Sequence, residues 1–154
     1  MDAKRDRRQR GALLIEALVG VALVGLLAAG GVGLVSLASR TAREAARRDE
    51  ARAAAEAAAA RATALSFAAL PPLFGARAGD AAAAVDTADR TAPAGWGELV
   101  AALPEGRLQC SLEGVGAGGV LAPFDDALAL RLRFVATWKE GADVRAVELV
   151  AFHF

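Results

Sequence analysis

The chain has 154 residues, of which 18 are basic and 18 acidic, so its formal net charge is zero. This length allows one ordinary domain and excludes a multidomain enzyme. One Cys and one His exclude an internal disulfide, a Cys-based zinc site and a multi-histidine metal centre. Without a basic excess, nothing indicates nucleic-acid binding. Hydrophobic residues make up 55% of the chain and the mean hydropathy is +0.35, which points to a membrane segment.

The N-terminal segment combines a basic head with a long apolar run. Residues 1–11 carry five basic and two acidic side chains, and residues 17–35 provide 19 successive positions without a polar side chain. A transmembrane helix needs about 20 apolar residues. Positive charge before such a run keeps that end in the cytoplasm. The pattern therefore predicts one membrane span, with the C-terminal part of the chain on the far side.

A cleaved secretory signal is the alternative interpretation of this segment. Such signals have a basic start, an apolar stretch and small residues at the cut site, and Ser36-Leu37-Ala38 fits a cut after Ala38. The apolar run is long for a signal peptide, and a carboxylate, Glu16, stands at its start. Both features favour a segment that stays in the protein.

A helix is expected to continue beyond the apolar run. Residues 40–70 include 15 Ala and contain neither Gly nor Pro, a composition that favours helix. We therefore predict one helix from about Leu13 to about Leu70, ended by Pro71-Pro72. Its first half is apolar all round and belongs in lipid or against other helices. Its second half presents a broad Ala face.

The C-terminal part predicts a small antiparallel sheet. After a loop region, residues 107–113 alternate between apolar and polar, and residues 128–138 alternate again. A Gly-containing turn at 139–143 leads into a return strand at 144–153, which makes a hairpin. The apolar face of the sheet is expected to pack on the second half of the helix. That face comprises Leu108, Cys110, Leu112, Leu128, Leu130, Leu132, Phe134, Ala136 and Trp138.

Few side chains remain as candidates for chemistry. His153 is expected at the surface, pointing outward with Arg145, while Trp96 and Trp138 are expected in the core or at its rim. The Gly-rich stretch 114–119 is not followed by the Lys-Ser/Thr of a phosphate-binding loop. The acidic residues lack the regular ligand spacing of a calcium loop; they are Asp125, Asp126, Glu140 and Asp143. We expect no metal, no cofactor and no enzymatic activity.

Residues 10–19, Arg-Gly-Ala-Leu-Leu-Ile-Glu-Ala-Leu-Val, resemble the processing signal of the type IV prepilin family. That pattern is a short basic leader, Gly before the cut, a hydrophobic residue after it and Glu at the fifth mature position. The resemblance implies cleavage between Gly11 and Ala12, N-methylation of Ala12, and an assembly role for Glu16. The chain departs from the usual pattern at Ala12, where Phe or Met is common. Gly30-Gly31 stands where the family often has Pro.

The family also implies an architecture and a function. The expected fold is α+β and pilin-like, with a long N-terminal helix whose second half packs on a small antiparallel sheet. The expected protein is a minor pilin or pseudopilin of a type IV pilus or type II secretion pseudopilus. It is most similar to the V-type minor pilins and the I-type minor pseudopilin. Its expected role is to help filament initiation or to occupy the tip. The implied segments are a leader (1–11), a transmembrane assembly half of the helix (12–39) and a periplasmic domain (40–154), the last divided into helix (40–70), variable loop (71–106) and sheet (107–154).

The resemblance implies partners as well: a prepilin peptidase, other pilin or pseudopilin subunits, and an inner-membrane assembly platform. The protein would sit in the inner membrane with a periplasmic C-terminal domain and then move into the filament. Two alternatives remain open. One is a signal-anchored periplasmic binding protein that does not polymerise, and the other is a secreted binding domain that begins at Ser39.

Glu16 has two interpretations. A carboxylate within a lipid-facing helix costs a few kcal/mol at the bilayer centre unless it is paired, and the ammonium created at Ala12 by cleavage is a natural partner during assembly. Alternatively, Glu16 is an interfacial residue that interacts favourably with the N-terminal end of the helix dipole.

Overall fold

The computed structural model describes the backbone of residues 3–88 and 92–154 and the side chains of residues 15–88 and 92–154. The chain forms two compact units, Met1–Glu44 and Ala45–Phe154. The layout is α+β, with a long N-terminal helix and one small antiparallel sheet, as the sequence predicts.

The helix α1 spans Ala3–Thr63, so both of its predicted ends are wrong. It begins ten residues before Leu13 and stops seven residues before Leu70, although no Gly or Pro breaks it there. The backbone of Ser66 is extended, with φ −69° and ψ 152°, and redirects the chain so that Leu70 becomes fully buried. Burying one such side chain contributes about 1.5–3 kcal/mol, which outweighs the helix propensity of a few Ala residues.

The two prolines do not end α1. They belong to a short helix, α2 (Leu70–Leu73), and occupy its first positions. A proline is tolerated there because the first amides of a helix have no intrahelical acceptor. A 3₁₀ turn, η1 (Phe67–Ala69), comes just before α2.

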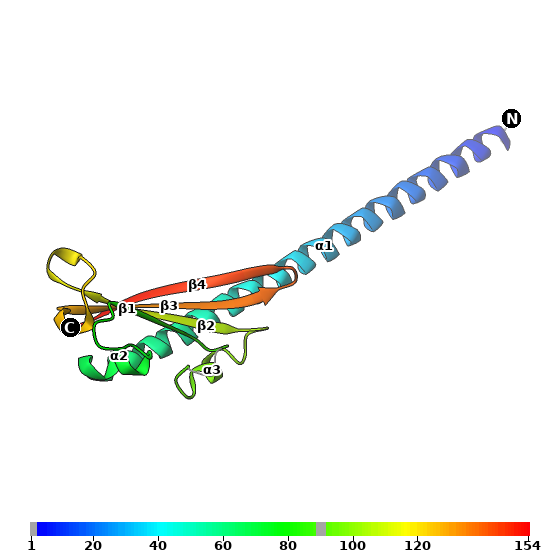
Figure 1. Cartoon of the computed structure of the whole chain (residues 1–154). Coiled ribbons are helices and arrows are strands. Elements are labelled where there is room, and N and C mark those ends of the chain that lie inside the picture. The colour runs from blue at the N-terminus through cyan, green and yellow to red at the C-terminus, as the bar shows by residue number, and fades with distance from the viewer. Residues whose placement is uncertain (1–2, 89–91) are drawn as a thin grey trace. The chain divides into compact units, whose positions relative to one another are not determined.

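The sheet has four antiparallel strands in the order β1-β2-β3-β4 (Figure 1). Three of them match the predicted strands: β2 (Arg107–Val115), β3 (Ala129–Glu140) and β4 (Asp143–His153). The fourth, β1 (Ala82–Asp86), lies in the segment predicted to be a loop. The remaining elements are short: α3 (Trp96–Leu99), η2 (Ala117–Gly119) and η3 (Phe124–Asp126).

Two glycines shape the connections of the sheet. Gly141 follows the end of β3 with φ 64°, as the first central position of a two-residue hairpin turn requires. Gly114 lies inside β2, and a Cβ placed there would overlap the carbonyl oxygen of Ala122. The backbone of Ala122 donates a hydrogen bond to the Gly114 carbonyl over 3.0 Å, so the chain returns directly against the strand.

The helix and the sheet share one core. The α1 residues in it are all Ala and recur every three or four positions, which places them on one side of the helix: Ala51, Ala54, Ala55, Ala58, Ala59 and Ala62. Their small size lets the helix approach the sheet closely. The inner face of the sheet contributes Val85, Leu108, Cys110, Leu112, Leu130, Leu132, Phe134, Ala136 and Trp138. The prediction that the second half of the helix covers the apolar sheet face is confirmed.

Two predicted side-chain positions are wrong. Leu128 is 68% exposed, because β3 begins only at Ala129 and Leu128 does not share the alternation of the strand. His153 lies on the inner side of the sheet, opposite the buried Leu130. Its ring stacks on Phe67 with centroids 6.2 Å apart, so it does not point outward. The prediction for Trp96 and Trp138 is confirmed, since both are buried.

Candidate functional site

The predicted processing and assembly residues all belong to α1. Gly11 and Ala12 have helical backbone, and the side chain of Ala12 lies outside the described part of the structure. The side chain of Glu16 is exposed. Glu16 follows Ala12 by four residues, which is about one helical turn or 6 Å along the axis. Positions four apart lie on the same helix face, so positions 12 and 16 share one side of the helix.

An apolar surface follows Glu16 along α1. The helix is long and apolar enough to cross a membrane, with mean hydropathy 2.4 in its most apolar window and none of that window buried. Large side chains are exposed all around the helix, which predicts contact with lipid or other helices. These side chains are Ile15, Leu18, Val19, Val21, Leu23, Val24, Leu26, Leu27, Val32, Leu34, Val35 and Leu37, each at least 52% exposed.

Five glycines interrupt this apolar surface. A Cβ added at Gly20, Gly25, Gly30, Gly31 or Gly33 would meet nothing within 4 Å. The fold of a single chain therefore does not require glycine at these positions. Glycines on a membrane helix permit close approach of a neighbouring helix, so the described surface leaves room for one.

The apolar surface ends near two hydroxyl residues whose side chains donate hydrogen bonds to the backbone of the preceding turn. Ser39 Oγ donates to the carbonyl of Ser36 over 2.9 Å, and Thr41 Oγ1 donates to the carbonyl of Ala38 over 2.9 Å. Hydroxyls bonded to the preceding turn add little polar cost in an apolar environment. The exposed Arg40 and Arg43 mark the start of the charged part of α1.

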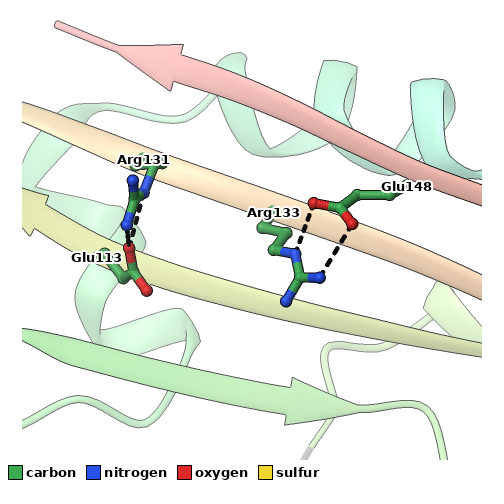
Figure 2. Close-up of polar contacts among 4 residues, drawn as sticks. All are labelled: Glu113, Arg131, Arg133 and Glu148. Carbon is green, nitrogen blue, oxygen red and sulfur yellow. Dashed lines mark hydrogen bonds and ion pairs between the residues drawn. The ribbon is translucent and has the colours of Figure 1, made fainter.

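The outer face of the sheet carries two arginine–carboxylate pairs (Figure 2). Arg133 donates hydrogen bonds to both carboxylate oxygens of Glu148, from Nε to Oε1 over 2.7 Å and from Nη2 to Oε2 over 2.9 Å. Arg131 donates a hydrogen bond to the Glu113 carboxylate on the neighbouring strand. The hydrogen bond from Arg133 lowers the pKa of Glu148. With Val150 and Phe152, these residues line a groove of about 410 Å³. Because each carboxylate is paired with an arginine and exposed to water, the pairs contribute little to stability, and they offer no acid–base pair.

One ion pair links the helix to the hairpin. Arg47 of α1 donates to Glu140 Oε1 over 3.2 Å, and Arg145 Nε lies 3.9 Å from Glu140 Oε2. Sequence reasoning missed this cluster, because 93 residues separate Arg47 from Glu140 and no local pattern connects them.

Within the described residues, no group of three or more His, Cys, Asp or Glu side chains is placed to hold a metal ion. Cys110 is buried on the inner face of the sheet, as predicted, and burial raises the pKa of its thiol. A protonated, inaccessible thiol is a poor nucleophile. No family model, curated protein or solved structure matches this chain.

Proposed function

We propose that this chain is an inner-membrane prepilin-like protein that matures into a minor structural subunit of a type IV pilus or type II secretion pseudopilus. The observation that carries the proposal is the arrangement on α1. A basic head leads to Gly11 and Ala12, a single carboxylate stands at Glu16, and an exposed apolar helix follows directly.

The first step of the proposal is anchoring. The exposed apolar surface from Ile15 to Leu37 is long enough for a membrane span, and residues 1–11 remain on the cytoplasmic side because they are basic. The charged part of α1 and the unit Ala45–Phe154 then lie in the periplasm. That unit has its own buried core.

The second step is processing. A prepilin peptidase cuts between Gly11 and Ala12, and the new amino group of Ala12 is methylated. Cleavage removes the basic leader and leaves one fixed positive charge at the start of the apolar helix. Glu16, one helical turn further on, is the only charged side chain between residues 12 and 39.

The third step is assembly. In the filament, the Glu16 carboxylate pairs with the Ala12 ammonium of a neighbouring subunit, since an unpaired carboxylate is costly among apolar helices. The five glycines that the fold does not require give neighbouring helices room to approach. The partners are other pilin or pseudopilin subunits and the inner-membrane assembly platform.

The deciding experiment is mass spectrometry of the N-terminus after expression with and without a prepilin peptidase. We expect a chain that begins at N-methylated Ala12 when the peptidase is present and retains residues 1–11 when it is absent. Retention of residues 1–11 in both hosts contradicts the proposal and supports a signal-anchored, non-polymerising binding protein. A chain that begins at Ser39 contradicts both and supports a secreted domain.

A further inference from the structure

The two edges of the sheet are built differently. At one edge, β1 has only five residues, and its side chains are small except for Val85 and Asp86. At the other edge, β4 has eleven residues, and in the described part of the chain the sheet ends there. Proteins normally protect a long edge with charges, proline or a bulge.

The second half of β4 lacks these protections. Its register with β3 runs without a skipped residue from Glu140↔Asp143 to Leu130↔His153, so the strand contains no bulge. Residues 149–154, Leu-Val-Ala-Phe-His-Phe, include no Asp, Glu, Lys, Arg or Pro. An apolar edge without a bulge is a template for another strand.

Backbone geometry determines which residues face the open edge. In an antiparallel pair, alternate residues direct both backbone groups to the neighbour. The two-residue turn is closed by Glu140 and Asp143. The backbone N–H and C=O groups of the odd-numbered residues of β4 therefore bond to β3. Those of the even-numbered residues point away from β3, in the plane of the sheet, toward the open edge. Val150 and Phe152 are among the latter, and their side chains are 46% and 52% exposed.

An extended strand is the occupant that fits this edge, because only another backbone can satisfy a row of alternating donors and acceptors in register. The β4 sequence is complementary to itself. When two copies run antiparallel about a two-fold axis at Ala151, residue 150 of each copy meets residue 152 of the other. Registers centred on Leu149 or Val150 place Glu148 opposite Val150 or Phe152, in the middle of the pairing. The register centred on Ala151 places Glu148 opposite Phe154, at the end of the overlap.

We propose that the open edge of β4 binds β4 of a second copy of this chain, antiparallel about a two-fold axis at Ala151, so that Val150 lies opposite the partner's Phe152. Such an interface is self-complementary, as two-fold dimers require. The overlap covers residues 148–154, about 24 Å of strand. This is smaller than a standard protein interface, so the association is weak and favoured by high local concentration. The proposal does not depend on processing or on Glu16.

Disulfide cross-linking of the full chain tests the register. The protein is oxidised in detergent micelles that greatly outnumber the chains. In Ala151→Cys, the two copies of residue 151 face each other with Cα atoms about 4.5–5.5 Å apart, within disulfide range. In the matched control Ala146→Cys, an exposed residue of the same strand, the two copies of residue 146 lie about 34 Å apart. We expect at least about tenfold more dimer from the first variant, because only its geometry permits the bond.

A second substitution tests the apolar contact. Val150→Lys in the Ala151→Cys protein places an ammonium against the partner's Phe152 and should reduce the dimer at least about tenfold. Val144→Lys is the control, since Val144 is 72% exposed and lies outside the overlap. If Ala151→Cys does not fold, mixing Glu148→Cys with Phe154→Cys decides the question, because only the mixed dimer should form. The proposal is overturned if Ala151→Cys and Ala146→Cys cross-link equally, or if Val150→Lys leaves the dimer yield of Ala151→Cys unchanged. It is also overturned if Glu148→Cys and Phe154→Cys form homodimers in place of the mixed dimer.

Discussion

Arg47, on the helix, donates a hydrogen bond to Glu140, at the end of β3, over 3.2 Å. The two side chains are 35% and 25% exposed, so water only partly screens the pair. This contact joins the helix to the hairpin end of the sheet at the point where the stripe of buried alanines begins at Ala51. It gives the otherwise uniform Ala face a fixed position against the sheet.

Removing this contact should destabilise the second unit. We expect Arg47→Ala to lower the free energy of unfolding by about 1 kcal/mol, because Glu140 then loses its hydrogen-bonded partner on the helix. Arg52→Ala is the control. Arg52 pairs with Glu56 on the same helix and is 71% exposed, so its loss should destabilise the protein clearly less than the loss of Arg47. Urea unfolding followed by tryptophan fluorescence measures both, and equal effects would contradict a positioning role for Arg47.

Enlarging the Ala stripe should be costly. Ala55 is fully buried against the sheet, so Ala55→Leu forces the helix away from the sheet and should destabilise the protein by about 1–3 kcal/mol. Ala53 lies on the exposed side of the same helix, and Ala53→Leu should change stability by less than about 0.5 kcal/mol. The urea concentrations at the midpoints of unfolding compare the stabilities of the two variants. A neutral Ala55→Leu would show that the helix is not closely packed on the sheet.

Cys110 should be unreactive in the folded chain. Because burial raises its pKa, a thiol reagent at pH 8 should modify Cys110 only after denaturation, whereas the exposed position in Ala146→Cys should react at once. The raised pKa also affects stability. Its contribution is fully present below the ordinary thiol value of 9.0 and is lost as pH rises above that value, by up to about 1.4 kcal/mol per pH unit. Cys110→Ala should lack this part of the pH dependence, and an identical alkaline profile would contradict the explanation.

Processing should depend on the absence of a side chain at residue 11. Gly11→Val should block conversion to the mature form, because the peptidase must accommodate the residue before the cut. Gly20→Val is the matched control: it lies further along the same helix, and a Cβ there meets nothing within 4 Å. Immunoblots of cells that express a prepilin peptidase distinguish precursor from mature chain. Normal maturation of Gly11→Val would refute the prepilin assignment.

Glu16 should matter for assembly and leave insertion and cleavage intact. Removing the charge makes membrane insertion easier, so Glu16→Ala should accumulate as mature protein in the inner membrane while its share in sheared filaments falls. Glu16→Gln should behave in the same way as Glu16→Ala, because the amide keeps the shape of the side chain and loses its charge. Glu50→Ala, at an exposed position beyond the apolar surface, serves as the control. Equal filament incorporation by all variants would leave Glu16 as an interfacial residue near the start of the helix.

The sequence by itself determined the features that depend on local pattern. Alternation at Leu108, Cys110 and Leu112 identified the buried face of β2, since successive strand residues point to opposite sides. The unbroken Ala-rich stretch predicted helix over residues 40–70, which the structure has as far as Thr63, and Gly141 located the hairpin turn. The candidate processing residues Gly11 and Ala12 and the candidate assembly residue Glu16 were proposed from the sequence alone, because the proposal depends on spacing along one segment.

Tertiary structure alone decided the features that depend on distant parts of the chain. No local signal identifies β1, whose residues are mostly Ala; the strand forms because Val85 lies opposite Cys110 and helps cover the core. The helix ends at Thr63 because burial of Leu70 competes with helix propensity. His153 points inward because the hairpin register places it opposite Leu130, whereas its alternation with Arg145 suggested the outer face. In each case, the free energy comes from contacts between segments that the local sequence does not encode.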